Sequence, residues 1–147
     1  MKNIFILNFF LASFMSFSQE IIRINSEEHL VKNRPFSQAI VVNDIIYLSG
    51  QIGTLPDGQL VSGGMEAETK QVLTNIQNLL ESMGSSMDAV FKCTCMLENI
   101  QDWPKMSAVY TSFFKKDKLP ARSAFAGSGL AAGAKIEIEC MAVVNSN

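Results

Sequence analysis

The sequence predicts an α+β domain in which one mixed β-sheet carries two helices on one face. Two stretches repeat apolar residues at helical spacing, and several short runs are rich in β-branched residues or alternate apolar with polar residues. In chain order these elements are a hairpin, a helix, a strand, a helix and two strands, which is an α+β arrangement. The 147 residues, 48% of them hydrophobic, are enough for one core and too few for two ordinary domains.

The N-terminus has the pattern of a secretory signal peptide. Lys2 precedes a short apolar run, and Ser16 and Ser18 form a small-x-small cleavage signal. The apolar run is shorter than the roughly 20 residues of a helix that crosses a bilayer. We therefore expect cleavage after residues 1–18, so that residues 19–147 form an exported domain, periplasmic or secreted, without membrane attachment. An uncleaved anchor or an N-terminal strand is the alternative.

A hairpin is the first element predicted after a polar lead-in over residues 20–34, which has room for one edge strand. Two β-branched runs, 39–42 and 45–48, are separated by Asn43 and Asp44, a pair that tolerates left-handed backbone. Glycines and prolines then predict a long loop up to residue 64.

The first helix is predicted over residues 65–83. Apolar residues recur there on one helical face, and Gly84 follows as a natural C-terminal stop. Residues 90–97 alternate as a half-buried strand.

The three cysteines are predicted to be small buried residues with free thiols. Cys93 and Cys95 share one face of their strand with Phe91 and Leu97, which places them in the core. Side chains two residues apart on a strand are too far apart for a relaxed disulfide, and Cys140 is distant in sequence. An odd number of cysteines in an exported protein also favours free thiols over a disulfide framework.

A second helix is predicted to begin at Asp102, a suitable N-cap, with Pro104 in its first turn. Its expected buried stripe comprises Met106, Val109, Tyr110, Phe113 and Phe114. Three lysines follow at its expected end, where cations meet the negative pole of the helix dipole: Lys115, Lys116 and Lys118.

Two strands, over residues 122–126 and 135–144, complete the predicted sheet. On the last strand one face carries Ile136, Ile138 and Cys140, and the other carries Glu137 and Glu139. Two helices cover only one face of the sheet, and Met141 and Val143 lie on the other. We expect sheets of identical subunits to complete the burial of that face.

Charge and histidine content exclude several classes of function. The formal net charge is −2, and loss of Lys2 with the signal segment leaves 11 basic against 14 acidic residues, or −3. This is not the basic surplus that binds a phosphate backbone, so no nucleic-acid partner is expected. His29 is the one histidine, which disfavours a histidine metal cluster or a Ser-His-Asp triad.

Arg122 is the residue that the sequence pattern alone indicates as a candidate functional residue. It lies between Pro120 and Ser123 at the entry to an apolar strand, where a guanidinium is costly unless an anion pairs with it. Two kinds of partner remain open at this point: an anionic ligand, or an ion pair with Glu137 or Glu139.

Four ordered segments closely resemble the reactive intermediate deaminase family, also called RidA or YjgF: PFSQA at 35–39, LSGQI at 48–52, PARS at 120–123 and IEIE at 136–139. The resemblance extends from about residue 36 to residue 144. It implies a chorismate-mutase-like fold, a homotrimer with sheets around a central barrel-like core, and ligand sites in the clefts between subunits. RidA-type members hydrolyse imines and enamines such as 2-aminoacrylate, which pyridoxal-phosphate enzymes release, to 2-oxo acids and ammonia.

By position, the resemblance implies that Arg122 grips the carboxylate of a small imino or enamino acid, for which a planar fork of N–H donors is suited. It also implies that Glu137 positions or activates the attacking water. Ser49 and Gly50 match the segment that lines the family's pocket. Imines are already electrophilic, so neither a metal nor a cofactor is expected.

Three positions depart from the family pattern. The family often has tyrosine, asparagine and cysteine where this chain has Phe36, Ser107 and Ala124. Loss of the phenol removes a hydrogen bond worth on the order of 1 kcal/mol, which bears on substrate range. Phe36 and Ser107 stay expected substrate-binding positions, although Phe36 also fits a core aromatic and Ser49 fits a hydroxyl bonded to backbone.

Two other functions remain open. The departures and the predicted export favour a non-catalytic module that binds small carboxylates or another protein. Some relatives are described as ribonucleases, but the mature charge of −3 argues against that activity.

Overall fold

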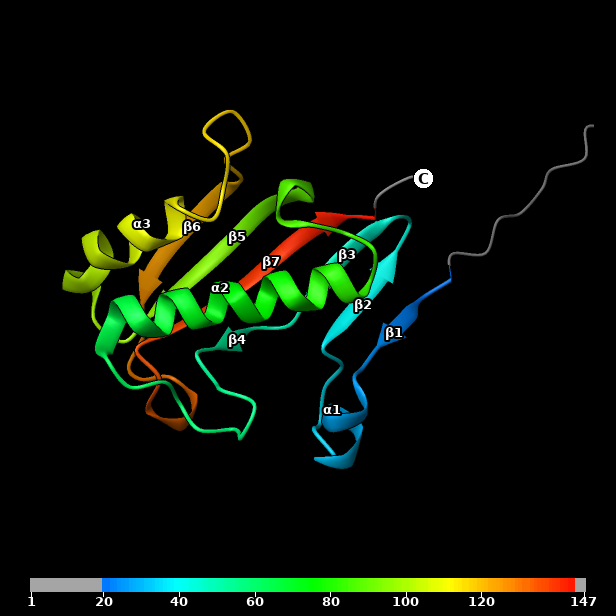
Figure 1. The fold of residues 1–147 in the computed structure, drawn as a ribbon, viewed down its shortest axis with the longest axis horizontal. Helices are drawn as coiled ribbons and strands as arrows, with labels where there is room; N and C mark the ends of the chain where they lie inside the picture. Colours follow the sequence, from blue (N-terminus) through cyan, green and yellow to red (C-terminus); the bar gives the residue numbers. More distant parts are fainter. Residues whose placement is uncertain (1–19, 145–147) are drawn as a thin grey trace, which may run out of the picture.

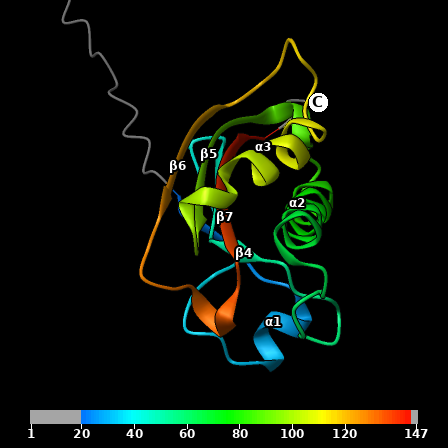
Figure 2. The ribbon, with the colours of Figure 1, turned by 90° about the vertical axis from the view of Figure 1, so that its left-hand side faces the viewer.

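The computed structural model of the chain describes residues 20–144 (Figure 1). The predicted signal segment, residues 1–18, lies outside this part of the chain. One sheet carries α2 (Gly64–Ser82) and α3 (Trp103–Thr111), and Figure 2 shows both helices on the same side of the strands. The predicted α+β class, a mixed sheet with two helices on one face, is confirmed.

The described strands form one sheet in the order β1-β2-β3-β7-β5-β6, and β4 pairs with β7. β5 and β6 run parallel, and the other paired strands run antiparallel. The strands are β1 (Ile22–Ile24), β2 (Ala39–Val42), β3 (Ile45–Leu48), β4 (Gln51–Ile52), β5 (Val90–Leu97), β6 (Ala121–Ala126) and β7 (Ile136–Val143). The shorter helical segments are α1 (Glu27–Val31) and 3₁₀ turns at Met87–Ala89, Ile100–Asp102 and Ala131–Gly133.

The predicted hairpin is present as β2 and β3. Asn43 and Asp44 form its turn with φ angles of 49° and 63°. A two-residue turn with positive φ at both positions matches the twist of the two strands, and Asn and Asp tolerate that conformation better than most residues.

The first predicted helix, α2, is confirmed to within one residue at each end. Five of its apolar side chains are buried in the core: Met65, Val72, Leu73, Ile76 and Leu80. Gly84 follows with a φ of 72°, the left-handed conformation that glycine adopts readily where a helix ends.

The second predicted helix, α3, begins after Asp102 as expected, but the Asp102 carboxylate does not cap it. A 3₁₀ turn leads directly into the helix here, so the backbone of Asp102 is already helical. The Asp102 carboxylate instead accepts a hydrogen bond from Lys105 Nζ at 2.8 Å.

The end of α3 also differs from the prediction. The helix ends at Thr111, before the lysines that were expected on its last turn. Lys115 and Lys118 instead form ion pairs with Asp88. Of the predicted stripe, Met106, Tyr110 and Phe114 are buried, and Val109 and Phe113 are half-buried.

Phe91 points away from the core, contrary to the prediction. The pairing of β5 with β7 is irregular between Val90 and Lys92. Because an extra residue in one strand shifts the alternation of its side chains, Phe91 is 41% exposed, while Cys93 and Cys95 are buried as predicted.

Two segments contain more structure than the sequence predicted. The expected loop over residues 50–64 includes β4, and the lead-in includes α1 as well as the edge strand β1. Ser26 caps α1 by accepting a hydrogen bond from the His29 backbone N–H at 3.2 Å.

The two faces of β7 differ as predicted. Ile136, Ile138 and Cys140 are buried on the helix-covered face, and Glu137 and Glu139 lie on the other face. Among the helices of residues 20–144, none is long and apolar enough to cross a bilayer.

Truncation of Leu73 should destabilise the protein, because this α2 side chain is fully buried. We expect Leu73→Ala to lower the free energy of unfolding by about 2–5 kcal/mol. Lys70→Ala, at an exposed position of the same helix, should change it by less than about 0.5 kcal/mol. Chemical denaturation measures both variants, and equal losses would contradict the core face assigned to α2.

Candidate functional site

The Arg122 side chain lies against one face of α3. Nη1 and Nη2 of its guanidinium both donate to Ser107 Oγ, each at 3.2 Å. The guanidinium carbon lies 4.7 Å from the centre of the Tyr110 ring and 5.3 Å from the Trp103 ring. Met106 Sδ is 4.0 Å from Nη1. We call these five residues the arginine cluster.

Helical spacing explains the arginine cluster. Its four helix residues are at positions 103, 106, 107 and 110, which lie on one face of α3. Arg122 pairs in register with Cys93, whose buried side chain marks the helix-covered face of the sheet. The guanidinium therefore extends from the edge strand β6 toward α3.

No carboxylate neutralises Arg122 within residues 20–144. An ion pair with Glu137 or Glu139, one of the alternatives open from sequence, is not formed in this structure. Burial, the largest cause, raises the pKa of Tyr110, so its phenol stays neutral beside the cation. Aromatic ring faces and a hydroxyl stabilise the guanidinium but leave its positive charge available to an anion.

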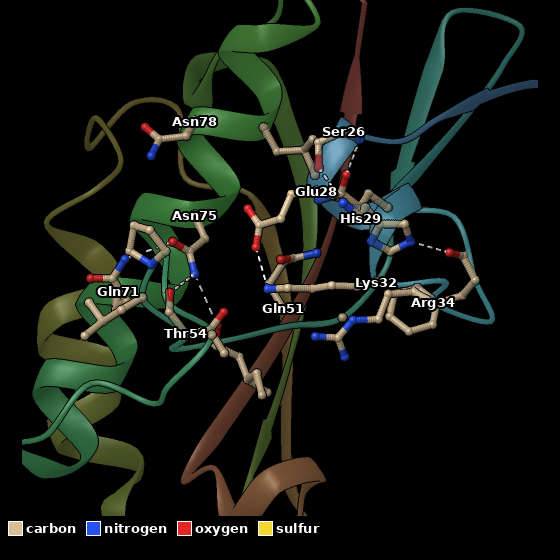
Figure 3. A pocket seen from close by; sticks show the side chains of 18 of the residues that line it. Ser26, Glu28, His29, Lys32, Arg34, Gln51, Thr54, Gln71, Asn75 and Asn78 are labelled. Atoms are coloured by element: carbon tan, nitrogen blue, oxygen red, sulfur yellow. Dashed lines mark hydrogen bonds and ion pairs between the residues drawn. The ribbon is translucent and has the colours of Figure 1, made fainter.

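A second group of predicted site residues lies at a cleft of about 610 Å³ between α1, β4 and α2 (Figure 3). Phe36, Gly50 and Glu137 line this cleft, whereas Ser49, Ser107 and Arg122 do not. Most of the side chains labelled in Figure 3 are polar, and they come from all three elements.

The Glu137 carboxylate lies directly beside the backbone of Gly50. A Cβ atom at position 50 would be only 1.9 Å from Glu137 Oε1, so any side chain there would displace the carboxylate. Gly50 is thus required for close approach rather than for an unusual φ. Its place just before β4, which pairs with β7 at Glu137, sets this contact.

Phe36 and Ser49 each take part in a hydrogen bond between a side chain and a backbone carbonyl. The Phe36 carbonyl accepts a hydrogen bond from His29 Nε2 at 2.5 Å, and the two rings pack edge to face. Phe36 is 47% exposed and lines the cleft, so it is not a core aromatic. Ser49 Oγ donates to the Ser37 carbonyl at 2.7 Å, which is the structural alternative predicted for this hydroxyl.

One chain does not bring Arg122 and Glu137 together. Arg122 pairs with Cys93 on β5, so its side chain is on the same face of the sheet as Cys93 and Cys95. Glu137 pairs with Met96, which is the neighbour of Cys95 along β5. Because neighbouring residues on a strand point to opposite faces, Arg122 and Glu137 lie on opposite faces of the sheet. The predicted site is therefore divided into two halves: the arginine cluster, and the cleft with Gly50 and Glu137.

Sequence reasoning missed several contributors to these two halves. The rings of Trp103 and Tyr110 were not connected with Arg122, although their helical spacing would have indicated a shared face. The cleft also includes Asn75, whose side chain donates to the Thr54 carbonyl at 2.9 Å and holds the loop after β4 against α2. Nothing in the local sequence pattern indicates that contact.

Metal-ligating side chains do not gather in the described part of the chain. Over residues 20–144 no group of three or more His, Cys, Asp or Glu residues could hold an ion. His29 is used in the contact with Phe36.

Comparison with known proteins identifies relatives over most of the chain. The family model described as Endoribonuclease L-PSP matches residues 26–144. The human protein named 2-iminobutanoate/2-iminopropanoate deaminase is 43% identical over 110 residues, which are 74% of this chain and 80% of the human one. An Arabidopsis thaliana relative named Reactive Intermediate Deaminase A, chloroplastic, is 39% identical over 75% of this chain and 59% of its own.

A solved structure of a Yersinia pestis protein, titled a member of the conserved Rid protein family, has the same fold. It superposes with a TM-score of 0.72 and 42% sequence identity, over 75% of this chain and 88% of its own. The motifs, the fold and the family model all agree, and the chain belongs to the L-PSP family, in which the RidA/YjgF proteins are placed.

Proposed function

We propose that this protein hydrolyses small 2-imino and 2-enamino acids to 2-oxo acids and ammonia. Relatives that carry deaminase names are about two-fifths identical to it over most of the chain, which supports this reaction class. The observation that carries the proposal is the half-buried Arg122 guanidinium, held by a hydroxyl and two aromatic rings and without a carboxylate partner in the described residues.

Arg122 would bind the substrate carboxylate. Both Nη groups donate to a single oxygen, Ser107 Oγ, which leaves other N–H donors of the guanidinium for a ligand. A carboxylate can accept two parallel bonds from such a fork. The carboxylate then fixes the position of the adjacent C=N carbon.

Glu137 would serve the hydrolytic step. An enamino acid first becomes the imino acid as a proton is added to its terminal carbon and one is lost from nitrogen. Water then attacks the imine carbon, a proton moves to nitrogen, and the resulting carbinolamine expels ammonia to leave the C=O group. A carboxylate can take the proton from water and return it to the leaving nitrogen. Because the imine carbon is already electrophilic, positioning and one proton-transfer group suffice, without a cofactor.

The site would be completed between copies of the chain. Arg122 and Glu137 are on opposite faces of one sheet, so a substrate that touches both must lie between two subunits. The face without helices also carries exposed apolar side chains: Tyr47, Phe125 and Val143. We propose a homotrimer in which these faces pack together and each cleft takes its two halves from neighbouring chains.

The compartment is also a proposal. The signal pattern over residues 1–18 supports export, which would place the enzyme where imines other than those of cytoplasmic metabolism are met. The N-terminal residue of the protein isolated from its host, together with the compartment that contains it, tests this point.

A second candidate is a module that binds small carboxylates without turnover. The absence of a phenol at Phe36 and of a thiol at Ala124 favours it, because both groups often occur at these positions in the family. Calorimetric binding of a 2-oxo acid, combined with no release of ketoacid from an imino acid generated in the assay, would favour this candidate. An endoribonuclease activity, which the family description names, is disfavoured because 12 basic against 14 acidic residues leave no basic surplus to bind an RNA backbone.

Substitution of Arg122 should weaken substrate binding in a graded way. A charged hydrogen bond contributes about 1.5–3 kcal/mol, so we expect Arg122→Ala to lower kcat/KM for 2-aminoacrylate by about ten- to a hundredfold or more. Arg122→Lys should fall between this variant and wild type, because lysine keeps the charge but not the fork. Arg23→Ala, at an exposed arginine of β1, is the control. Equal rates for wild type and Arg122→Ala would contradict the proposal.

An alanine at position 50 should impair turnover more than binding. The added methyl group displaces the Glu137 carboxylate, while Arg122 on the other half-site is untouched. We expect Gly50→Ala to lower kcat by about ten- to a hundredfold with little change in KM. Gly127→Ala is the matched control, since its new Cβ would have no neighbour closer than 3.9 Å. A change confined to KM would exclude a catalytic role for Glu137.

Mixed trimers should recover activity that the separate variants lack. Arg122→Ala and Glu137→Gln are each expected to be nearly inactive. After the two are unfolded and refolded together, about one quarter of the clefts would pair an intact Arg122 with an intact Glu137 from the neighbouring chain. Arg122→Ala refolded with the double variant is the control, because no cleft regains Arg122. Activity no higher than this control would rule out a shared site.

A further inference from the structure

Two cysteines face each other across the middle of the sheet. Cys93 on β5 and Cys140 on β7 are directly paired in the antiparallel register. Their sulfur atoms are 2.7 Å apart, and the residues are only 0% and 2% exposed. Both are free thiols here, and neither has a role in the proposed deamination.

The backbone at this pair suits a disulfide bond. Directly opposed residues on antiparallel strands have Cα atoms about 4.5 or 5.5 Å apart. Disulfides span Cα separations of about 4.4–6.8 Å. The two side chains already point to the same face and toward each other, so the bond requires a rotation of side chains and no movement of the strands.

The third cysteine does not compete for this bond. Cys95 is paired with Ile138 and lies two residues from Cys93 along the same strand. That spacing is too long for an unstrained bond between Cys93 and Cys95. Cys95 is also 0% exposed, and burial raises its pKa to about 12, so its thiol stays protonated.

We propose that Cys93 and Cys140 are a redox site that closes to a buried cross-strand disulfide when the chain folds in an oxidising compartment. One cysteine thiolate attacks the S–S bond of a small-molecule disulfide such as oxidised glutathione, and one glutathione thiol leaves. The other cysteine attacks the protein sulfur of this mixed disulfide and releases the second thiol. Two protein thiols thereby lose two electrons and two protons, and the glutathione disulfide gains them.

The two thiols of the folded pair differ in the direction of their pKa shifts. The hydrogen bond with the Cys140 thiol lowers the pKa of Cys93 most, burial opposes this effect, and the neighbouring Tyr110 hydroxyl and Arg122 charge lower it further. The same hydrogen bond and burial raise the pKa of Cys140. These contacts exist only in the folded chain, where neither cysteine is more than 2% exposed, so either thiolate can be the one that attacks the oxidant during folding.

The cross-link would join the two strands between the halves of the predicted site. β5 holds β6, which carries Arg122, and β7 carries Glu137. Oxidation would therefore fix the register of the strands that set the positions of both residues. This inference does not depend on the proposed deamination.

The test counts thiols after refolding, so that burial does not block access of the oxidant. Reduced, unfolded protein is refolded either with reduced glutathione alone or with a mixture of reduced and oxidised glutathione. It is then denatured in acid and alkylated, and intact mass gives the number of free thiols. Wild type, with three cysteines, should fall from three free thiols to one in the oxidising mixture.

Variants distinguish this pair from other bonds. Cys95→Ala should fall from two thiols to none, whereas Cys140→Ala and Cys93→Ala should each keep two. Peptide mapping of oxidised wild type should show a Cys93–Cys140 cross-link within one chain. If Cys93→Ala or Cys140→Ala does not refold, the peptide map of wild type and the thiol count of Cys95→Ala still identify the bonded pair.

Two results would overturn the inference. One is wild-type protein that regains its native circular dichroism spectrum in the oxidising mixture and still has three free thiols. The other is a cross-link that maps to Cys95, to a second chain or to glutathione.

Discussion

The proposed function depends on the Arg122 guanidinium, whose positive charge no carboxylate of the described residues neutralises. A half-buried guanidinium loses hydration, and here it recovers only a hydroxyl and two ring faces, from Ser107, Trp103 and Tyr110. These contacts hold the Arg122 side chain in place, but they do not neutralise its positive charge. A ligand with a carboxylate supplies what is missing, and this is why an acid group, rather than a phosphate backbone or a metal, is the expected object of recognition in a chain of net charge −2.

The pleat of the sheet separates the chemistry from this binding group. Alternation along β6 and β7 directs Arg122 to the helices and Glu137 to the open face, so a single chain does not bring these two residues together. In the proposed trimer, assembly would be part of catalysis, because it would place the Glu137 carboxylate of one chain opposite the Arg122 guanidinium of its neighbour. The buried thiols Cys93 and Cys140 lie on β5 and β7, and β7 also carries Glu137.

Periodicity in the sequence was sufficient to predict those features that depend on residues within one element or turn. The Asn43-Asp44 turn, the face of α2 and the alternation of β7 are local properties, and all three were predictable. The irregular pairing that exposes Phe91 and the two-residue strand β4 depend on a neighbouring strand, which leaves no local pattern. The Asp102 carboxylate does not cap α3, because the 3₁₀ turn before the helix already gives Asp102 a helical backbone.

The motifs nominated Arg122 and Glu137, but their assignment to opposite faces follows from strand register, which no spacing in one sequence reveals. The claim that the Arg122 guanidinium receives a substrate carboxylate is tested most directly by a crystal structure of the assembled protein with bound 2-oxobutanoate, a stable product of the proposed reaction. We expect the ligand carboxylate at about 2.7–2.9 Å from both Nη atoms, with Glu137 of a neighbouring chain facing the oxo carbon. Arg122 paired with a protein carboxylate, or a ligand bound away from it, would contradict the account.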